Sequence, residues 1–267
     1  MNRLCIALYG IGLLALASTA ASAEVVVASP TGKFTNDGPT NASGPGVGFD
    51  RWFANNVRAG GSVGITTTYA NNGNGSLEFS GPANAKADFE YYFSAANQFN
   101  LSDLTGLSFD YLRSDSSTAA AWLAPAIRLA VTNGTNSGYL VYENVYNGVQ
   151  VTPVNSFVSQ DVTSAKVWGT GNLPGAFSEY GRTFADWNTL LPNLRVTALS
   201  VGIGSGWNGS FSGAVDRVSY SVNGNNTTFN FEAATPAVPE PSTWMMLVLG
   251  FGVIGYAMRR KTVLRYV

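Results

Sequence analysis

The segment GAVDRVSYSVNGNNTTFNFE, from Gly213 to Glu232, contains two runs rich in β-branched and aromatic residues. The runs are Ala214–Val222 and Thr227–Phe231, and an Asn-Gly pair and an Asn-Asn pair stand between them. Val, Tyr, Phe and Thr favour strands, whereas Asn and Gly favour turns. This segment therefore predicts two short β-strands separated by a turn.

Runs of the same kind recur along the middle of the chain, and clusters of Asn, Gly and Pro separate them. They lie at Glu24–Ala28, Val63–Tyr69, Ser76–Ser80, Asp88–Phe93, Gly106–Leu112, Ala126–Val131, Tyr139–Val145 and Val196–Ile203. Many short strands with turn signals between them are typical of a β-sandwich or barrel. One short helix is predicted at Thr183–Leu191, because its apolar residues follow a helical spacing, Thr183 can cap it and Pro192 can end it.

The first 23 residues have the pattern of a secretory signal peptide. Arg3 supplies a positive charge, Leu4–Ala17 is apolar, and Ala21-Ser22-Ala23 is a small-residue cleavage pattern. The single cysteine, Cys5, would leave with this segment. We therefore expect residues 24–232 to form an exported ectodomain that folds without disulfides.

The composition of the chain excludes several kinds of chemistry. The chain contains no histidine, so a Ser-His-Asp triad and a histidine-ligated metal are excluded, and residues after Cys5 hold no thiol. Between Glu24 and Val238, fifteen Asp and Glu residues stand against ten Lys and Arg, a net charge of −5. Nucleic acid is not expected as a partner, because binding phosphates needs clustered basic residues.

The C-terminal tail has three parts after a linker at 233–238. Pro239-Glu240-Pro241 is followed by the apolar segment Trp244–Met258 and by the basic cluster Arg259-Arg260-Lys261. A helix of that apolar length spans roughly 22 Å, less than the ~30 Å of a bilayer core. This length and the basic end predict a transient membrane helix with its basic end in the cytoplasm.

This order of parts resembles the PEP-CTERM sorting signal of Gram-negative bacteria. The resemblance covers residues 239–267 and implies that an exosortase recognises Pro239, Glu240 and Pro241, while Arg259, Arg260 and Lys261 act as the stop. It further implies a transient stay in the inner membrane, followed by the cell surface, outer envelope or extracellular matrix. Proteins with this tail accompany exopolysaccharide and biofilm production. A plain tail anchor is the alternative.

Four other motifs resemble the galactose-binding-like jelly roll, a fold that includes many carbohydrate-binding modules. They are GFDRWF at 48–53, GSLEFSG at 75–81, LSFDYLRS at 107–114 and the segment 213–232. The resemblance implies an all-β jelly-roll sandwich. It also implies a Ca²⁺ site shared by Asp50 and Asp216, which hold matching early and late positions; no other cofactor is expected.

Sugar rings stack on aromatic side chains, so the tryptophans are candidates for carbohydrate binding. Trp122, Trp168 and Trp207 have glycine, alanine or proline neighbours that suggest exposed loop tips. Trp187 is expected in the core. The opposing interpretation is that these rings fill the ends of the core.

Paired carboxylates are the remaining route to catalysis. Asp88 and Glu90 are two positions apart on a predicted strand, so they share a face, while Phe89 and Tyr91 point the other way. Such a pair could serve a glycoside hydrolase. A solvated outer strand face is the simpler interpretation. We therefore expect a non-enzymatic exported surface or matrix protein that binds polysaccharide or is structural, with the hydrolase as the alternative.

Overall fold

The computed structural model describes residues 22–29, 48–234 and 241–263 of the 267-residue chain. The chain divides into two compact units, Met1–Ala233 and Ala234–Val267. The predicted signal peptide lies outside the described residues except for Ser22 and Ala23, which begin strand β1. The motif residues Pro239 and Glu240 also lie outside the described residues.

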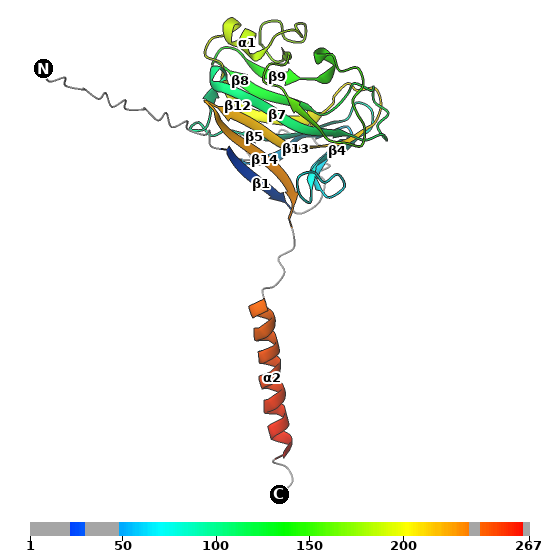
Figure 1. Ribbon diagram of the computed structural model, residues 1–267, viewed down its shortest axis with the longest axis vertical. Helices are drawn as coiled ribbons and strands as arrows, with labels where there is room; N and C mark the ends of the chain where they lie inside the picture. Colours follow the sequence, from blue (N-terminus) through cyan, green and yellow to red (C-terminus); the bar gives the residue numbers. More distant parts are fainter. Residues whose placement is uncertain (1–21, 30–47, 235–240, 264–267) are drawn as a thin grey trace, which may run out of the picture. The chain divides into compact units, whose positions relative to one another are not determined.

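The first unit is a β-sandwich of two sheets (Figure 1). In sheet A the strand order is β1-β14-β13-β4-β3, with β7 paired to β13 and β10 paired to β7. Its strands are β1 (Ser22–Ser29), β3 (Ser62–Thr66), β4 (Ser76–Gly81), β7 (Leu104–Arg113), β10 (Val158–Asp161), β13 (Phe211–Val222) and β14 (Asn225–Ala233). Among the described strands of this sheet, every pairing is antiparallel except that of β1 with β14.

Sheet B is antiparallel and has the order β11-β9-β8-β12-β5-β2, with β6 also paired to β12. Its strands are β2 (Trp52–Arg58), β5 (Lys86–Tyr92), β6 (Phe99–Asn100), β8 (Ala126–Thr132), β9 (Ser137–Tyr142), β11 (Val167–Gly169) and β12 (Arg195–Ile203). Short 3-10 helices at Leu101–Asp103 and Asn144–Asn147 join strands of the sandwich.

The predicted all-β sandwich with one short helix is confirmed, and each of the ten predicted strands is present. The non-sequential strand order in both sheets is that expected of a jelly roll. Four strands were not predicted: β2, β6, β10 and β11. Strand β2 contains an Asn-Asn pair and a bulge, with Asn56 at a φ of 54°, and the other three have at most four residues.

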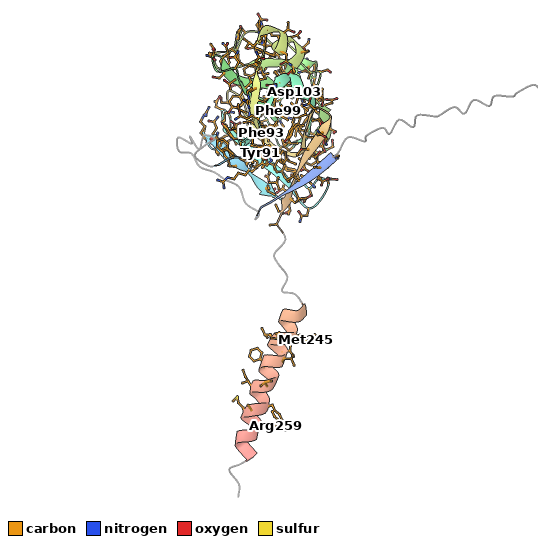
Figure 2. The ribbon with its side chains drawn as sticks, turned by 90° about the vertical axis from the view of Figure 1, so that its left-hand side faces the viewer. Tyr91, Phe93, Phe99, Asp103, Met245 and Arg259 are labelled. Carbon is orange, nitrogen blue, oxygen red and sulfur yellow. The ribbon has the colours of Figure 1, made fainter. Side chains whose placement is uncertain are left out.

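Aromatic rings from the two sheets meet in the core. The ring centroids of Trp52 in sheet B and Phe231 in sheet A are 5.2 Å apart, and those of Tyr91 and Phe229 are 4.9 Å apart. Figure 2 shows Tyr91 and Phe93 succeeding one another along the sandwich. These contacts join the sheets because each ring comes from the inward face of its strand.

The predicted helix is confirmed as α1, Phe184–Leu190. Thr183 caps it: its hydroxyl accepts from the backbone N–H of Asp186, and the Asp186 carboxylate accepts from the backbone N–H of Thr183. This capping box satisfies amide groups that a short helix otherwise leaves unpaired. Trp187 is fully buried, as expected, and its indole N–H donates to the Val167 carbonyl at 3.1 Å.

The second unit contains helix α2, Pro241–Val263, which is longer than the predicted apolar helix at 244–258. The helix begins at Pro241, the last residue of the motif, because proline is well tolerated in the first turn of a helix. Met245 and Arg259, labelled in Figure 2, lie toward its two ends. Within the described residues, no helix has both the length and the hydropathy needed to cross a membrane.

Replacing Phe231 by alanine should lower the free energy of unfolding by roughly 3–5 kcal/mol, because the ring is fully buried against both sheets. Phe49→Ala is the matched control, since that ring is 46% exposed and its loss should cost less than about 0.5 kcal/mol. Urea unfolding of both variants measures the difference. Equal losses would mean that Phe231 does not join the two sheets.

Candidate functional site

A cavity of ≈ 400 Å³ opens on the face of sheet B that points away from sheet A. The alternation of strand β5 creates its floor: Phe89 and Tyr91 face the core, and Asp88 and Glu90 face the cavity. The expected sharing of one face by the two carboxylates is confirmed. The lining residues are Asn55, Asn56, Lys86, Asp88, Glu90, Arg128, Tyr139, Val141, Glu143, Trp168, Thr170, Phe177, Gly204 and Ser205.

Strand register brings distant parts of the sequence to this face. One row of paired residues crosses the whole sheet, and its members are Phe53, Glu90, Ser200, Arg128, Val141 and Trp168. The row therefore places a carboxylate, a hydroxyl, a guanidinium and an indole side by side across the sheet. Such convergent polar groups beside aromatic rings are typical of small-molecule sites.

Asp88 is held as a buried anion. Its Oδ1 receives the Arg128 guanidinium at 2.7 Å and the Lys86 ammonium at 2.8 Å, and its Oδ2 accepts from the Asn56 amide at 3.0 Å. Burial opposes ionisation, but the charges of Arg128 and Lys86 outweigh it and lower the pKa of Asp88. The simpler interpretation of a solvated strand face is wrong, since Asp88 is 4% and Glu90 2% exposed.

Glu90 has the opposite electrostatic character. Burial, and then the charge of Asp88, raise the pKa of the Glu90 carboxyl. Its Oε2 accepts from the Asn55 amide at 2.6 Å, and its Oε1 accepts from the Tyr139 hydroxyl at 3.2 Å. Both oxygens of Glu90 are thus engaged by neighbouring donors.

Aromatic residues form one wall of the cavity. The Trp168 indole N–H donates to Glu143 at 3.2 Å, and the Trp168 ring lies 5.7 Å from the ring of Phe177 and 5.9 Å from that of Tyr180. Phe177 is 61% exposed and has a φ of 60°. A bulky residue in the left-handed region is uncommon and strained. The loop therefore keeps an apolar ring exposed to solvent at the cavity wall, in a backbone conformation that phenylalanine rarely adopts.

The structure separates the three predicted sugar-binding tryptophans. Trp168 lines the cavity, while Trp122 is 40% exposed and is not among the lining residues. The expectation that Trp207 is exposed is wrong: it is 8% exposed, and its ring packs against Phe211 at 5.2 Å. The glycines around Trp207 signalled a loop but could not show that the loop folds inward.

The two predicted calcium ligands have separate surroundings. Asp50 is exposed and accepts from the backbone N–H of Ser94, whereas Asp216 is fully buried in β13 and accepts from the backbone N–H of Phe231. In the part of the chain that the structure describes, no three His, Cys, Asp or Glu side chains form a metal-binding group.

Several cavity residues were not predicted from the sequence. Arg128, Tyr139 and Glu143 come from strands β8 and β9 and the segment that follows, and Phe177 comes from a loop. Arg128 had one available signal, because it interrupts an apolar strand and a buried charge needs a partner. No local pattern marked Phe177.

Comparison with known families places a defined motif in the tail. Residues 237–261 match the PEP-CTERM protein-sorting motif, which confirms the resemblance drawn from Pro239-Glu240-Pro241. The match covers the tail and leaves the sandwich unassigned. No curated protein sequence matches this chain.

Solved structures similar to the sandwich are distant. A family 11 carbohydrate-binding module from Clostridium thermocellum, in complex with a beta-1,3-1,4-mixed-linked tetrasaccharide, is 13% identical over 77% of this chain and 100% of that chain, with a TM-score of 0.36. The family 11 xylanase from Neocallimastix patriciarum is 18% identical over 71% of this chain and 99% of that chain, with a TM-score of 0.32. Similarity at this level leaves the ligand of this chain undefined.

Lys86 should make stability depend on pH. Burial, and then the charge of Arg128, lower the pKa of Lys86 from 10.5 to about 8. Between these two values the unfolded chain binds the proton and the folded chain does not, so the contribution of Lys86 to the free energy of unfolding should rise with pH by roughly 3 kcal/mol across the interval. Lys86→Met should remove this rise. Urea unfolding from pH 7.5 to 10.5 tests it, and parallel curves for both proteins would contradict it.

Proposed function

We propose that this chain is an exported bacterial surface or matrix protein whose sheet B cavity binds a polysaccharide. The observation that carries the proposal is the pairing of an aromatic wall, the half-buried Trp168 and the exposed Phe177, with a floor of fixed hydrogen-bonding groups. Sugars present apolar C–H faces to aromatic rings and hydroxyl groups to polar side chains. A cavity with both kinds of surface is suited to such a ligand.

The charges of the cavity favour a neutral sugar over a strongly charged one. Two cations, Lys86 and Arg128, stand beside three carboxylates, those of Asp88, Glu90 and Glu143. Asp88 is already paired with both cations. A further fixed charge on the ligand would have to compete with these pairs in a partly desolvated site, which is costly. Sugar hydroxyls can instead both donate and accept.

Export and sorting follow from the two ends of the chain. The predicted signal peptide would direct the chain out of the cytoplasm, and the tail motif at 237–261 would be recognised by an exosortase. The basic cluster at 259–261 would stay on the cytoplasmic side during sorting. The membrane stage, release to the surface and a role in biofilm are parts of this proposal.

Hydrolysis of the bound polysaccharide is the second candidate function. It is favoured by the opposite pKa shifts of Asp88 and Glu90, since acid and base roles require carboxyl groups held in different protonation states. Binding is the better supported function, because both oxygens of each carboxylate already accept hydrogen bonds or ion pairs. Release of reducing ends that is lost in Glu90→Gln would establish hydrolysis instead.

Removing the aromatic wall should weaken polysaccharide binding. Trp168→Ala and Phe177→Ala should each raise the dissociation constant at least about tenfold, as expected for an anchor residue. Trp122→Ala is the matched control, because this exposed tryptophan does not line the cavity. Affinity electrophoresis against a panel of neutral and acidic polysaccharides measures retention. Retention that depends on Trp122 rather than on Trp168 and Phe177 would place the site elsewhere.

Sorting should require the motif. In a host with its exosortase, the native chain should lose its tail, and a variant with Pro239, Glu240 and Pro241 all replaced by alanine should keep it. Mass spectrometry and fractionation give the mature mass and location, and a strain without the enzyme is the control. If the tail persists in all strains, the motif is only a linker and the tail is a plain membrane anchor.

A further inference from the structure

Strand β1 is the outermost strand of sheet A, beside β14 (Figure 1). It pairs with β14 along all eight of its residues, Ser22–Ser29, and no other described strand pairs with its outer edge. An edge strand presents a row of unpaired N–H and C=O groups, which is a template for pairing with another strand. The outer edge of β1 is therefore a place where a further strand can add to sheet A.

The other edge strands of the sandwich are protected in ways that β1 is not. Strand β3 is almost wholly buried, and β6, β10 and β11 have two to four residues each. Strand β2 has a bulge between Asn55 and Arg58 and ends in the charge of Arg58. Coverage, short length, bulges and charges are the usual protections of an edge. Strand β1 has a regular ladder and contains no proline, lysine or arginine, so its edge stays open to pairing.

The side chains of β1 leave apolar surface exposed at this edge. Val27 packs against the core, and the alternation of a strand places Val25 on the same side. Glu24 and Val26 lie on the other face, where Glu24 accepts from the Asn230 amide at 3.0 Å. Val25 is 42% exposed and Val26 is 57% exposed. Two valines on opposite faces of one edge strand thus remain in contact with water.

We propose that β1 pairs antiparallel with β1 of a second copy of this chain, so that sheet A continues across a two-fold axis. The predicted cleavage after Ala23 would leave six residues for this pairing, Glu24–Ser29. An axis at Val26 sets this residue against its own copy, and sets Val25 against Val27 of the second copy. The exposed valines are then covered on both faces of the joined sheet, and the unpaired backbone groups gain partners.

Charge and symmetry favour this partner and this direction. In the antiparallel register, Glu24, the one charged residue of β1, lies opposite Ala28 of the second copy. A parallel pairing in the same register would place the two Glu24 carboxylates directly opposite each other, which is destabilising. A two-fold contact is self-complementary and uses the open β1 edge of both copies, so the assembly ends at a dimer.

The dimer would present two sheet B cavities. Because each cavity binds polysaccharide under the proposed function, a long polymer would be held at two points and would gain from the high effective concentration of the second site. This consequence rests on the proposed function. The pairing of β1 does not, since β1 belongs to sheet A and the cavity to sheet B, so either proposal can fail without the other.

Sedimentation velocity of the full chain after export, in mild detergent matched to the density of the solvent, tests the pairing. Six residues a side form a small interface, so the dissociation constant should lie between about 10 µM and about 1 mM. The native chain should shift from monomer to dimer across this range of concentration. Val26→Lys places two like charges at the axis and should raise the dissociation constant at least about tenfold. Val151→Lys is the matched control, because Val151 is an exposed valine outside β1.

Val26→Glu should weaken the dimer in the same way. An equimolar mixture of Val26→Lys and Val26→Glu should restore it, because opposite charges then meet at the axis. Restoration also shows that both variants fold, since unfolded chains would not form this pair. Any of three results would overturn the proposal: a native chain that stays monomeric up to about 1 mM, an unweakened dimer in Val26→Lys, or a mixture that associates no better than its components.

Discussion

The alternation of side chains along β5 links the core of this protein to its candidate site. Phe89 and Tyr91 point inward and pack against rings of sheet A, and this fixes Asp88 and Glu90 on the opposite face. A shift of one residue in register would bury the carboxylates in the core and expose the rings. The aromatic contacts between the sheets therefore also hold the floor of the cavity in position.

Burying carboxylates imposes its own requirements on the rest of sheet B. Asp88 remains charged because Arg128 and Lys86 reach it from β8 and from its own strand. Glu90 is satisfied by an amide from β2 and a hydroxyl from β9. A network in which every group has a partner is rigid, whereas a buried charge left alone is very costly. Rigidity of this kind suits a binding surface, because little conformational freedom is then lost when a ligand binds.

The two sheets treat buried polar groups differently. In sheet B, Asp88 is paired with cations, Glu90 accepts from an amide and a hydroxyl, and both face an open cavity. In sheet A, Asp216 Oδ2 and Asn230 Oδ1 receive no hydrogen bond from any residue that the structure describes, and residues 71–75 contact their surroundings. Asp216 stands where β13 changes its partner from β4 to β14, and it accepts there from the backbone N–H of Phe231. One sheet thus presents an open polar surface, and the other encloses its buried oxygens.

Local patterns were enough for the ten predicted strands, the helix capped by Thr183 and the sorting motif, since turn residues, strand alternation, helix caps and a linear motif each act within a few residues of the chain. The shared face of Asp88 and Glu90 followed from the same two-residue period. The partners of those acids did not: Asn55, Arg128 and Tyr139 lie 35, 40 and 49 residues from them in sequence. Pairing between strands so far apart, and the inward fold of the loop at Trp207, depend on how the sheets assemble, because burial and charge compensation are properties of the packed molecule rather than of any one segment.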